Sequence, residues 1–174
     1  MDKIHPLAET LGAALKAHGY VLILAESCTG GMVAEAITSV AGSSAWFDRA
    51  YVTYSNQSKI DLLNVLSETL NNHGAVSEQT ATEMALGCIS KVCLNKTGVN
   101  DRKKLIAGSI TGIAGPDGGT ADKPVGTVCF AWASSDSPVE TQTKVFSGNR
   151  QQIRQQATVF MLENLIQRLI YANT

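Results

Sequence analysis

The residues with the clearest capacity for chemistry lie in the segment Ala25–Gly31, which reads Ala-Glu-Ser-Cys-Thr-Gly-Gly. An apolar run at residues 20–25 precedes it and a helical pattern at residues 32–40 follows it, which predicts that Ser27 lies at a strand-to-helix turn. Backbone N–H groups and the positive end of a helix dipole converge at such a turn and stabilise negative charge. Ser27 is therefore a candidate nucleophile for acyl transfer. The candidate ligands for an oxyanion or a substrate are the next residues, Thr29, Gly30 and Gly31. The alternative is that Ser27 or Thr29 only caps the helix.

A serine nucleophile needs a base, and the segment Tyr51–Lys59 offers one. No histidine lies near either motif, but a lysine whose pKa is lowered by burial can take the serine proton. A tyrosine hydroxyl can relay or orient that proton. We therefore take Lys59 as the candidate base and Tyr54 as its assistant. The alternative is a surface lysine on a short helix.

A glycine-rich segment after a predicted strand forms the third candidate. It reads Gly-Ile-Ala-Gly-Pro-Asp-Gly-Gly over residues 112–119 and returns through Lys-Pro-Val-Gly at residues 123–126. Small residues let the backbone approach a ligand closely, and ligands collect beyond the carboxyl ends of strands in α/β sheets. The candidate substrate-binding residues are Thr111, Gly112, Gly115 and Arg150, the last as a phosphate ligand. The alternatives are a plain hairpin loop and an exposed arginine.

The elements that must position these residues alternate between helix and strand. The predicted helices cover residues 3–19, 32–40, 55–63 or 57–63, 67–73, 77–94 and 149–171, with Gly19 ending the first and Ser77 capping the fifth. The predicted strands cover residues 21–25, 50–54, 105–113, 126–134 and 140–147, the last as a half-exposed or edge strand. The polar segment 95–104 is predicted as an exposed loop. This order predicts an α/β fold, a three-layer α/β/α sandwich with a mixed β-sheet, built as one domain over residues 1–174.

Composition narrows the class of protein. Hydrophobic residues make up 44% of the chain, charged residues 17%, and the formal net charge is -1, which argues against nucleic-acid binding as the main role. No apolar run approaches the ~18 residues of a membrane span, and the first residues lack the apolar core of a signal peptide. We expect a cytoplasmic protein without a membrane partner. The four cysteines and three histidines are too scattered to predict a metal site.

Five strings, taken together and in order, resemble the CinA C-terminal-domain family, and within it the stand-alone nicotinamide-nucleotide amidases. They are AESCTGG, GSSAWFDRAYVTYSNQSK, HGAVSEQT, GIAGPDGGTADKPVGTV and FSGNR, and they span essentially the whole chain. The resemblance implies hydrolysis of nicotinamide mononucleotide to nicotinate mononucleotide and ammonia, with no metal or organic cofactor, by a dimer or a higher homo-oligomer. It also implies that Ser27, Tyr54 and Lys59 carry the catalysis.

Two other functions are compatible with the same residues. A non-catalytic module that binds a nucleotide would use the turn at Ala25–Gly31 (the serine turn) and the glycine-rich segment at residues 112–119 (the glycine loop). Such a module would have no reason to bury Lys59 against Ser27. A cysteine hydrolase would use Cys28, whose thiolate a helix N-terminus favours, although no histidine is available to pair with it. We expect Cys28 to be a packing residue.

Overall fold

The centre of the molecule is a five-stranded mixed β-sheet. The structure is a computed structural model and describes residues 3–94 and 104–171. Its strands are β1 (Tyr20–Glu26), β2 (Phe47–Val52), β3 (Lys104–Gly112), β4 (Thr127–Ser134) and β5 (Glu140–Val145), in the order β2-β1-β3-β4-β5. β1 runs parallel to both β2 and β3, whereas β4 is antiparallel to β3 and β5. The carboxyl ends of β1, β2 and β3 therefore meet at one edge of the sheet.

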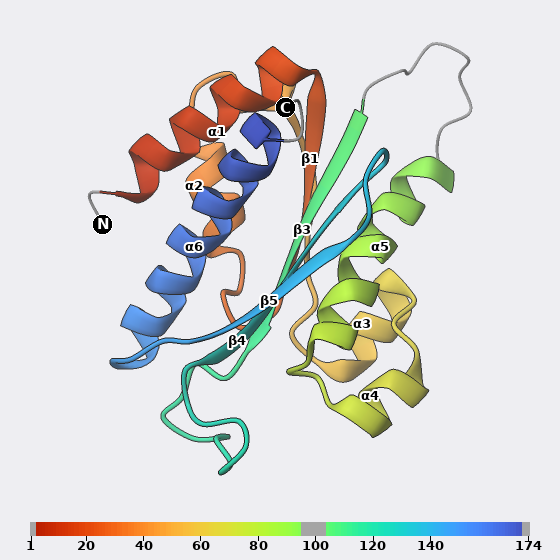
Figure 1. Cartoon of the computed structure of the whole chain (residues 1–174), viewed down its shortest axis with the longest axis vertical. Coiled ribbons are helices and arrows are strands. Elements are labelled where there is room, and N and C mark those ends of the chain that lie inside the picture. The colour runs from red at the N-terminus through yellow and green to blue at the C-terminus, as the bar shows by residue number, and fades with distance from the viewer. Residues whose placement is uncertain (1–2, 95–103, 172–174) are drawn as a thin grey trace.

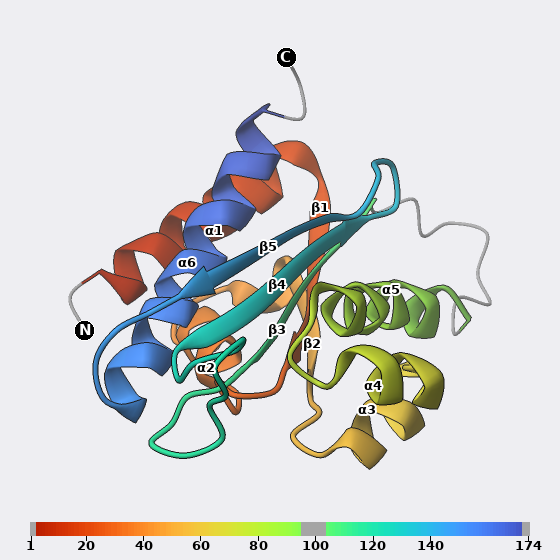
Figure 2. The same cartoon turned by 60° about the horizontal axis from the view of Figure 1, so that its bottom comes forward.

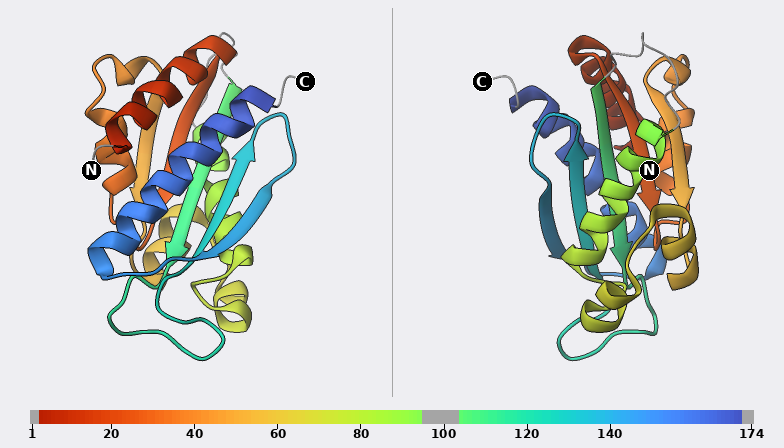
Figure 3. Two further views of the ribbon diagram at one scale, coloured as in Figure 1. Left: turned by 60° about the vertical axis from the view of Figure 1, so that its left-hand side comes forward. Right: turned by 90° about the vertical axis from the view of Figure 1, so that its right-hand side faces the viewer.

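Helices cover both faces of this sheet (Figure 1, Figure 2). One face carries α1 (Ile4–His18), α2 (Met32–Thr38) and α6 (Arg150–Tyr171), and the other carries α3 (Asn56–Leu63), α4 (Ser67–His73) and α5 (Glu78–Leu94). Figure 3 shows α1 and α6 side by side on the first face, with α5 crossing the second. A short 3₁₀ turn at Ser43–Ala45 leads into β2. The predicted three-layer α/β/α sandwich with a mixed sheet is confirmed.

Burial explains why β1 and β3 lie at the centre. Six of the seven residues of β1 are buried, and so are all residues of β3 from Leu105 to Thr111. Strands covered by helices on both faces read as continuous apolar runs, as these do. Among residues 3–94 and 104–171, β5 pairs with β4 alone; it alternates in exposure, with Val145 62% exposed. The prediction of an edge strand at this position is confirmed.

Local signals set several boundaries as predicted. Gly19 ends α1 in the left-handed conformation at φ 72°, and its N–H bonds the Leu15 carbonyl. Ser77 caps α5, because its hydroxyl accepts the Thr80 N–H at 3.1 Å. Both predictions are confirmed.

The second strand was predicted wrongly as residues 50–54. It begins at Phe47, because Leu22 of β1 pairs with Phe47 and donates its N–H to Trp46. It ends at Val52, and Tyr54 lies beyond the sheet. α2 ends at Thr38, two residues earlier than predicted. The predicted loop at residues 95–104 lies outside the described residues except for Lys104, which begins β3.

A glycine inside α5 sets the distance between α5 and α3. A Cβ atom added at Gly87 would overlap the carbonyl oxygen of Leu63 and lie 2.9 Å from its Cβ. Leu63 is the last residue of α3 and follows Lys59 by one helical turn. The absence of a side chain at Gly87 thus allows α3 to seat Lys59 where it lies.

We predict that Gly87→Ala destabilises the protein, although alanine favours an isolated helix over glycine by ~1 kcal/mol. Overpacking against backbone costs about 1–3 kcal/mol, so a net loss of roughly 1 kcal/mol in the free energy of unfolding is expected. Urea unfolding measures it. The control is Leu86→Ala at the neighbouring residue, which is 47% exposed. A gain in stability for Gly87→Ala would contradict the packing argument.

Candidate active site

A small cavity opens where the carboxyl ends of the parallel strands meet. Its volume is about 210 Å³. The segments after β1 and β2, the end of β3, the connection between α4 and α5, and the starts of α3 and α6 all contribute to it. The residues that line it are Ser27, Cys28, Tyr54, Lys59, Ala75, Val76, Thr111, Gly112, Ala114 and Arg150. The three segments that the sequence singled out therefore meet in one place.

Lys59 and Ser27 are in direct contact inside this cavity. The Nζ of Lys59 lies 3.1 Å from the Oγ of Ser27 and donates to the carbonyl oxygen of Thr53 at 2.8 Å. The lysine is only 1% exposed, and burial lowers its pKa from the ordinary value of 10.5. A lysine with a lowered pKa has a larger neutral fraction at a given pH, and the neutral amine is a base. The alternative of a surface lysine is wrong.

The start of α3 aims Lys59 at the serine. Ser55 caps this helix by accepting the N–H of Ser58 at 3.0 Å, and the Ser58 hydroxyl accepts the N–H of Ser55 at 3.1 Å. This reciprocal capping box fixes the first turn of the helix. Lys59 follows immediately, and its long side chain reaches the carbonyl oxygen of Thr53, the first residue after β2.

The side chain of Glu26 occupies the N-terminus of α2, where free backbone N–H groups were expected. This fully buried carboxylate accepts the N–H groups of Gly31 at 3.0 Å, Val33 at 3.2 Å and Ala34 at 2.8 Å. The N–H of Gly30 bonds the carbonyl oxygen of Ser27. The N–H groups of Gly30 and Gly31 are therefore already engaged and do not wait for an oxyanion. The sequence analysis missed Glu26, although an acidic residue just before a helix start is a recognisable signal.

Arg154 holds the opposite side of the serine turn. Its Nε donates to the carbonyl oxygen of Cys28 at 3.1 Å, and its Nη2 donates to that of Thr29 at 2.7 Å. The sequence analysis singled out Arg150 and missed Arg154. The spacing of four residues, which places both arginines on one face of α6, is the signal that could have found it.

Tyr54 and Arg150 meet at the mouth of the cavity. The hydroxyl of Tyr54 accepts the Nη2 of Arg150 at 2.8 Å, and the Nη1 of Arg150 donates to the carbonyl oxygen of Gly115 at 2.8 Å. Tyr54 is 60% exposed and forms no hydrogen bond to Ser27 or Lys59. Tyr54 lines the same cavity without a hydrogen bond to the candidate base.

The glycine loop borders the cavity, and packing accounts for part of its composition. The hydroxyl of Thr111 donates to the carbonyl oxygen of Ala75 at 2.7 Å, so it ties β3 to the connection between α4 and α5. A Cβ atom at Gly112 would lie 2.8 Å from Val128. One at Gly115, where φ is +77°, would lie 2.5 Å from Val125. Gly112 thus allows close approach of the β4 backbone, and Gly115 leaves room for the Val125 side chain at a positive φ.

Cys28 is a packing residue in this structure. Its side chain is 6% exposed and belongs to the hydrophobic core, and burial raises the pKa of its thiol to about 12. The expectation that the helix N-terminus favours its thiolate is wrong, because desolvation outweighs that effect and the nearby Glu26 carboxylate also opposes the thiolate.

Within residues 3–94 and 104–171, no group of three or more His, Cys, Asp or Glu side chains is arranged to hold a metal ion. No helix in the same ranges is long and apolar enough to cross a membrane.

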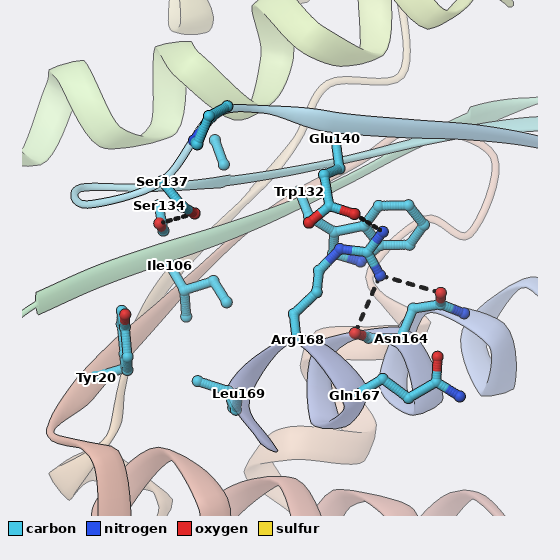
Figure 4. Close-up of a pocket in the computed structure, with 12 residues that line it drawn as sticks. Tyr20, Ile106, Trp132, Ser134, Ser137, Glu140, Asn164, Gln167, Arg168 and Leu169 are labelled. Carbon is cyan, nitrogen blue, oxygen red and sulfur yellow. Dashed lines mark hydrogen bonds and ion pairs between the residues drawn. The ribbon is translucent and has the colours of Figure 1, made fainter. Parts of the chain in front are cut away.

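A larger hollow of about 470 Å³ lies near Tyr20, the first residue of β1, and thus at the opposite end of that strand from Ser27. Figure 4 shows its most prominent contact, the guanidinium of Arg168 over the ring of Trp132, 3.7 Å from the ring centroid. Arg168 also donates to Glu140 and Asn164. The hollow brings no nucleophile and base together, so we place the candidate chemistry at Ser27.

Known proteins share the sequence and the fold that hold this buried serine–lysine pair. The model of the CinA C-terminal domain family matches residues 4–169. The chain therefore belongs to the CinA C-terminal domain family. The resemblance seen in the sequence motifs is confirmed.

Individual relatives are similar over nearly the full length. The chain is 51% identical over 168 residues to the nicotinamide-nucleotide amidohydrolase PncC of Enterobacter agglomerans, covering 97% of this chain and 96% of that protein. It is 48% identical over 169 residues to the protein of the same name from Escherichia coli strain K12, with the same coverage. The crystal structure of a CinA superfamily protein from Klebsiella pneumoniae matches with a TM-score of 0.86 and 37% identity, covering 97% of this chain and 98% of that one.

The buried amine predicts a pH-dependent effect of Lys59→Met on stability. Because the pKa of Lys59 is lower in the folded protein than its ordinary value of 10.5, the unfolded chain binds more protons between these two values. The wild type therefore gains stability as pH rises through this window, whereas a methionine does not titrate. We expect Lys59→Met to be more stable than the wild type below the window, by a margin that shrinks as pH rises.

Urea unfolding at a series of pH values measures this margin. The matched control is Lys16→Met, which replaces an exposed lysine of α1. A margin for Lys59→Met that does not change with pH would contradict a buried lysine with a lowered pKa.

Proposed function

We propose that this chain is a nicotinamide-nucleotide amidohydrolase that cleaves the carboxamide of nicotinamide mononucleotide through an acyl-enzyme on Ser27. The observation that carries the proposal is the 3.1 Å contact between Ser27 Oγ and the buried Lys59 Nζ. The two relatives named PncC support the choice of substrate. A protein that only binds a nucleotide would gain nothing from burying a lysine against a serine, because the burial costs free energy.

The acylation step follows from the contacts of Lys59. Its neutral amine keeps one N–H on the carbonyl oxygen of Thr53, and its nitrogen lone pair is available to accept the hydroxyl proton of Ser27. The amine takes the serine proton as Oγ attacks the carboxamide carbon. The tetrahedral intermediate then collapses, the C–N bond breaks, and the proton on Lys59 passes to the leaving ammonia. In the second half, Lys59 takes a proton from a water molecule while the water oxygen attacks the acyl carbon. The ester bond to Ser27 then breaks, nicotinate mononucleotide leaves, and the proton on Lys59 returns to the Oγ of Ser27.

The oxyanion needs donors that the fold has not already used. Within the serine turn as described, the N–H groups of Cys28 and Thr29 bond no carbonyl or carboxylate oxygen, whereas those of Gly30 and Gly31 do. We assign Cys28 and Thr29 as the oxyanion donors in place of the glycines. Such a donor contributes roughly 3 kcal/mol to the stabilisation of a transition state in acyl-transfer enzymes.

The size of the cavity limits what enters it. A volume of about 210 Å³ is below the roughly 300 Å³ at the lower end of small-molecule sites, so we propose that only the pyridine ring and its amide enter. Ribose and phosphate then lie at the mouth, beside the glycine loop and Arg150. Binding energy from this remote part of the substrate positions the amide on Ser27.

Partners and location complete the proposal. We infer a single-domain cytoplasmic enzyme that needs no nucleic acid, membrane or organic cofactor and that assembles into a homo-oligomer. The family match over residues 4–169 supports one domain, and the low net charge is compatible with a small-molecule substrate. The oligomer rests on family resemblance alone.

We predict that Ser27→Ala and Lys59→Met each reduce ammonia release from nicotinamide mononucleotide by at least about 10³-fold, because nucleophile and base act as one unit. Steady-state ammonia release measures the effect, with Cys28→Ala as the control that keeps most of its activity. Near-normal turnover of either of the first two variants would overturn the role assigned to that residue.

A separate prediction concerns Tyr54, which we propose assists proton transfer once substrate displaces it from Arg150. Catalytic hydrogen bonds are often incomplete before substrate binds. Tyr54→Phe is then expected to lower kcat by roughly 100-fold with little change in KM. The reverse pattern, an unchanged kcat with a raised KM, would restrict Tyr54 to holding the substrate at the mouth.

A further inference from the structure

Arg154 forms a two-pronged contact with the backbone just after the nucleophile. Its Nε and Nη2 donate to the carbonyl oxygens of Cys28 and Thr29, 3.1 Å and 2.7 Å away. Arg154 is half-buried, and among the described residues it forms no ion pair with a carboxylate. Its planar fork is thus committed to two consecutive peptide groups of the serine turn.

These two contacts fix the direction of backbone N–H groups. A trans peptide is planar, so the N–H of Thr29 points away from the carbonyl of Cys28 in the same peptide group. With that carbonyl held by Arg154, the N–H of Thr29 faces away from the guanidinium. The next peptide obeys the same rule, because its N–H on Gly30 turns back to the carbonyl oxygen of Ser27 at 3.0 Å.

Glu26 and Arg154 restrain the turn through complementary groups. The carboxylate of Glu26 takes N–H groups on the α2 side, from Gly31 onward. The guanidinium of Arg154 donates to the carbonyl oxygens of Cys28 and Thr29, next to Ser27. The positive charge of Arg154 lies beside the turn, where it also favours a developing oxyanion.

We propose that Arg154 is a positioning residue of the reaction: it holds the Cys28–Thr29 peptide group so that the N–H of Thr29 is preorganised to stabilise the oxyanion. This rests on the proposed function. Because Arg154 acts on the transition state through the backbone, its loss lowers kcat and leaves KM nearly unchanged. Arg150, one helical turn earlier, is exposed to substrate at the mouth and its loss raises KM.

The test compares Arg154→Ala, Arg154→Lys and Arg168→Ala. Arg168 lies on the same helix 14 residues later, about 21 Å away at ~1.5 Å per residue, and stacks on Trp132 outside the site. Two rates are measured for each variant: ammonia release from nicotinamide mononucleotide, and covalent labelling of Ser27 by a fluorophosphonate, followed by intact mass. Ser27→Ala gives the background of the labelling reaction, which also builds negative charge on an oxygen beside Ser27.

We expect Arg154→Ala to lower kcat and the labelling rate about 100-fold each, the scale of misplacing a reacting group by about 1 Å. KM should change less than threefold. Arg154→Lys keeps the charge but cannot span both carbonyls, so it should recover only part of the loss. Added guanidinium ion at tens of millimolar should restore activity to Arg154→Ala and have no such effect on Lys59→Met. Arg168→Ala should match the wild type.

The outcomes separate this proposal from the proposed substrate. A normal labelling rate and a normal kcat for Arg154→Ala would overturn the positioning role. So would wild-type values of both for Arg154→Lys, which cannot bond both carbonyl oxygens. A wild type that is labelled at Ser27 but releases no ammonia would overturn the substrate and leave the labelling comparison to decide on Arg154. A wild type that is neither labelled nor releases ammonia would overturn both. If Arg154→Ala does not fold, judged by its unfolding transition, Arg154→Lys carries the same comparison.

Discussion

The site depends on one interaction, the burial of the Lys59 amine between the hydroxyl of Ser27 and the carbonyl oxygen of Thr53. No carboxylate within the described residues forms an ion pair with this lysine. An uncompensated ammonium at 1% exposure is unfavourable, so burial shifts Lys59 towards its neutral form. Around it the fold supplies a helix start that aims the lysine, a strand end that holds it, and Gly87, which lets α3 approach α5.

The second constraint is the electrostatic balance of the serine turn. A helix N-terminus that follows a nucleophile looks like a ready anion site, but the buried carboxylate of Glu26 has taken its N–H groups. Glu26 therefore stabilises the junction between β1 and α2 and keeps the helix end from competing for the substrate. In the mechanism that we propose, the N–H groups of Cys28 and Thr29 stabilise the oxyanion instead. The same carboxylate helps to keep Cys28 as a thiol.

Much of the architecture could be predicted because it is encoded by local patterns. Alternating apolar runs and turn residues predicted the elements, and the absence of a histidine near the serine motif pointed to Lys59. The sequence analysis missed Glu26 and Arg154 because their partners are main-chain N–H and C=O groups, which every residue carries. The start of β2 was misplaced for a similar reason, since its pairing with Leu22 of β1 decides where it begins. Contacts across 125 or more residues leave no local trace.

The most direct test of the account is a comparison of two pKa values in the free enzyme. One is the pKa of the Lys59 amine, measured by nitrogen-15 NMR against the Lys59→Met spectrum. The other is the pKa that governs kcat/KM for ammonia release, which reports the essential base of the free enzyme. The account predicts that both lie below 10.5 and coincide, with activity rising as Lys59 loses its proton. A Lys59 that titrates at its ordinary value, or a kcat/KM that follows a different group, would contradict it.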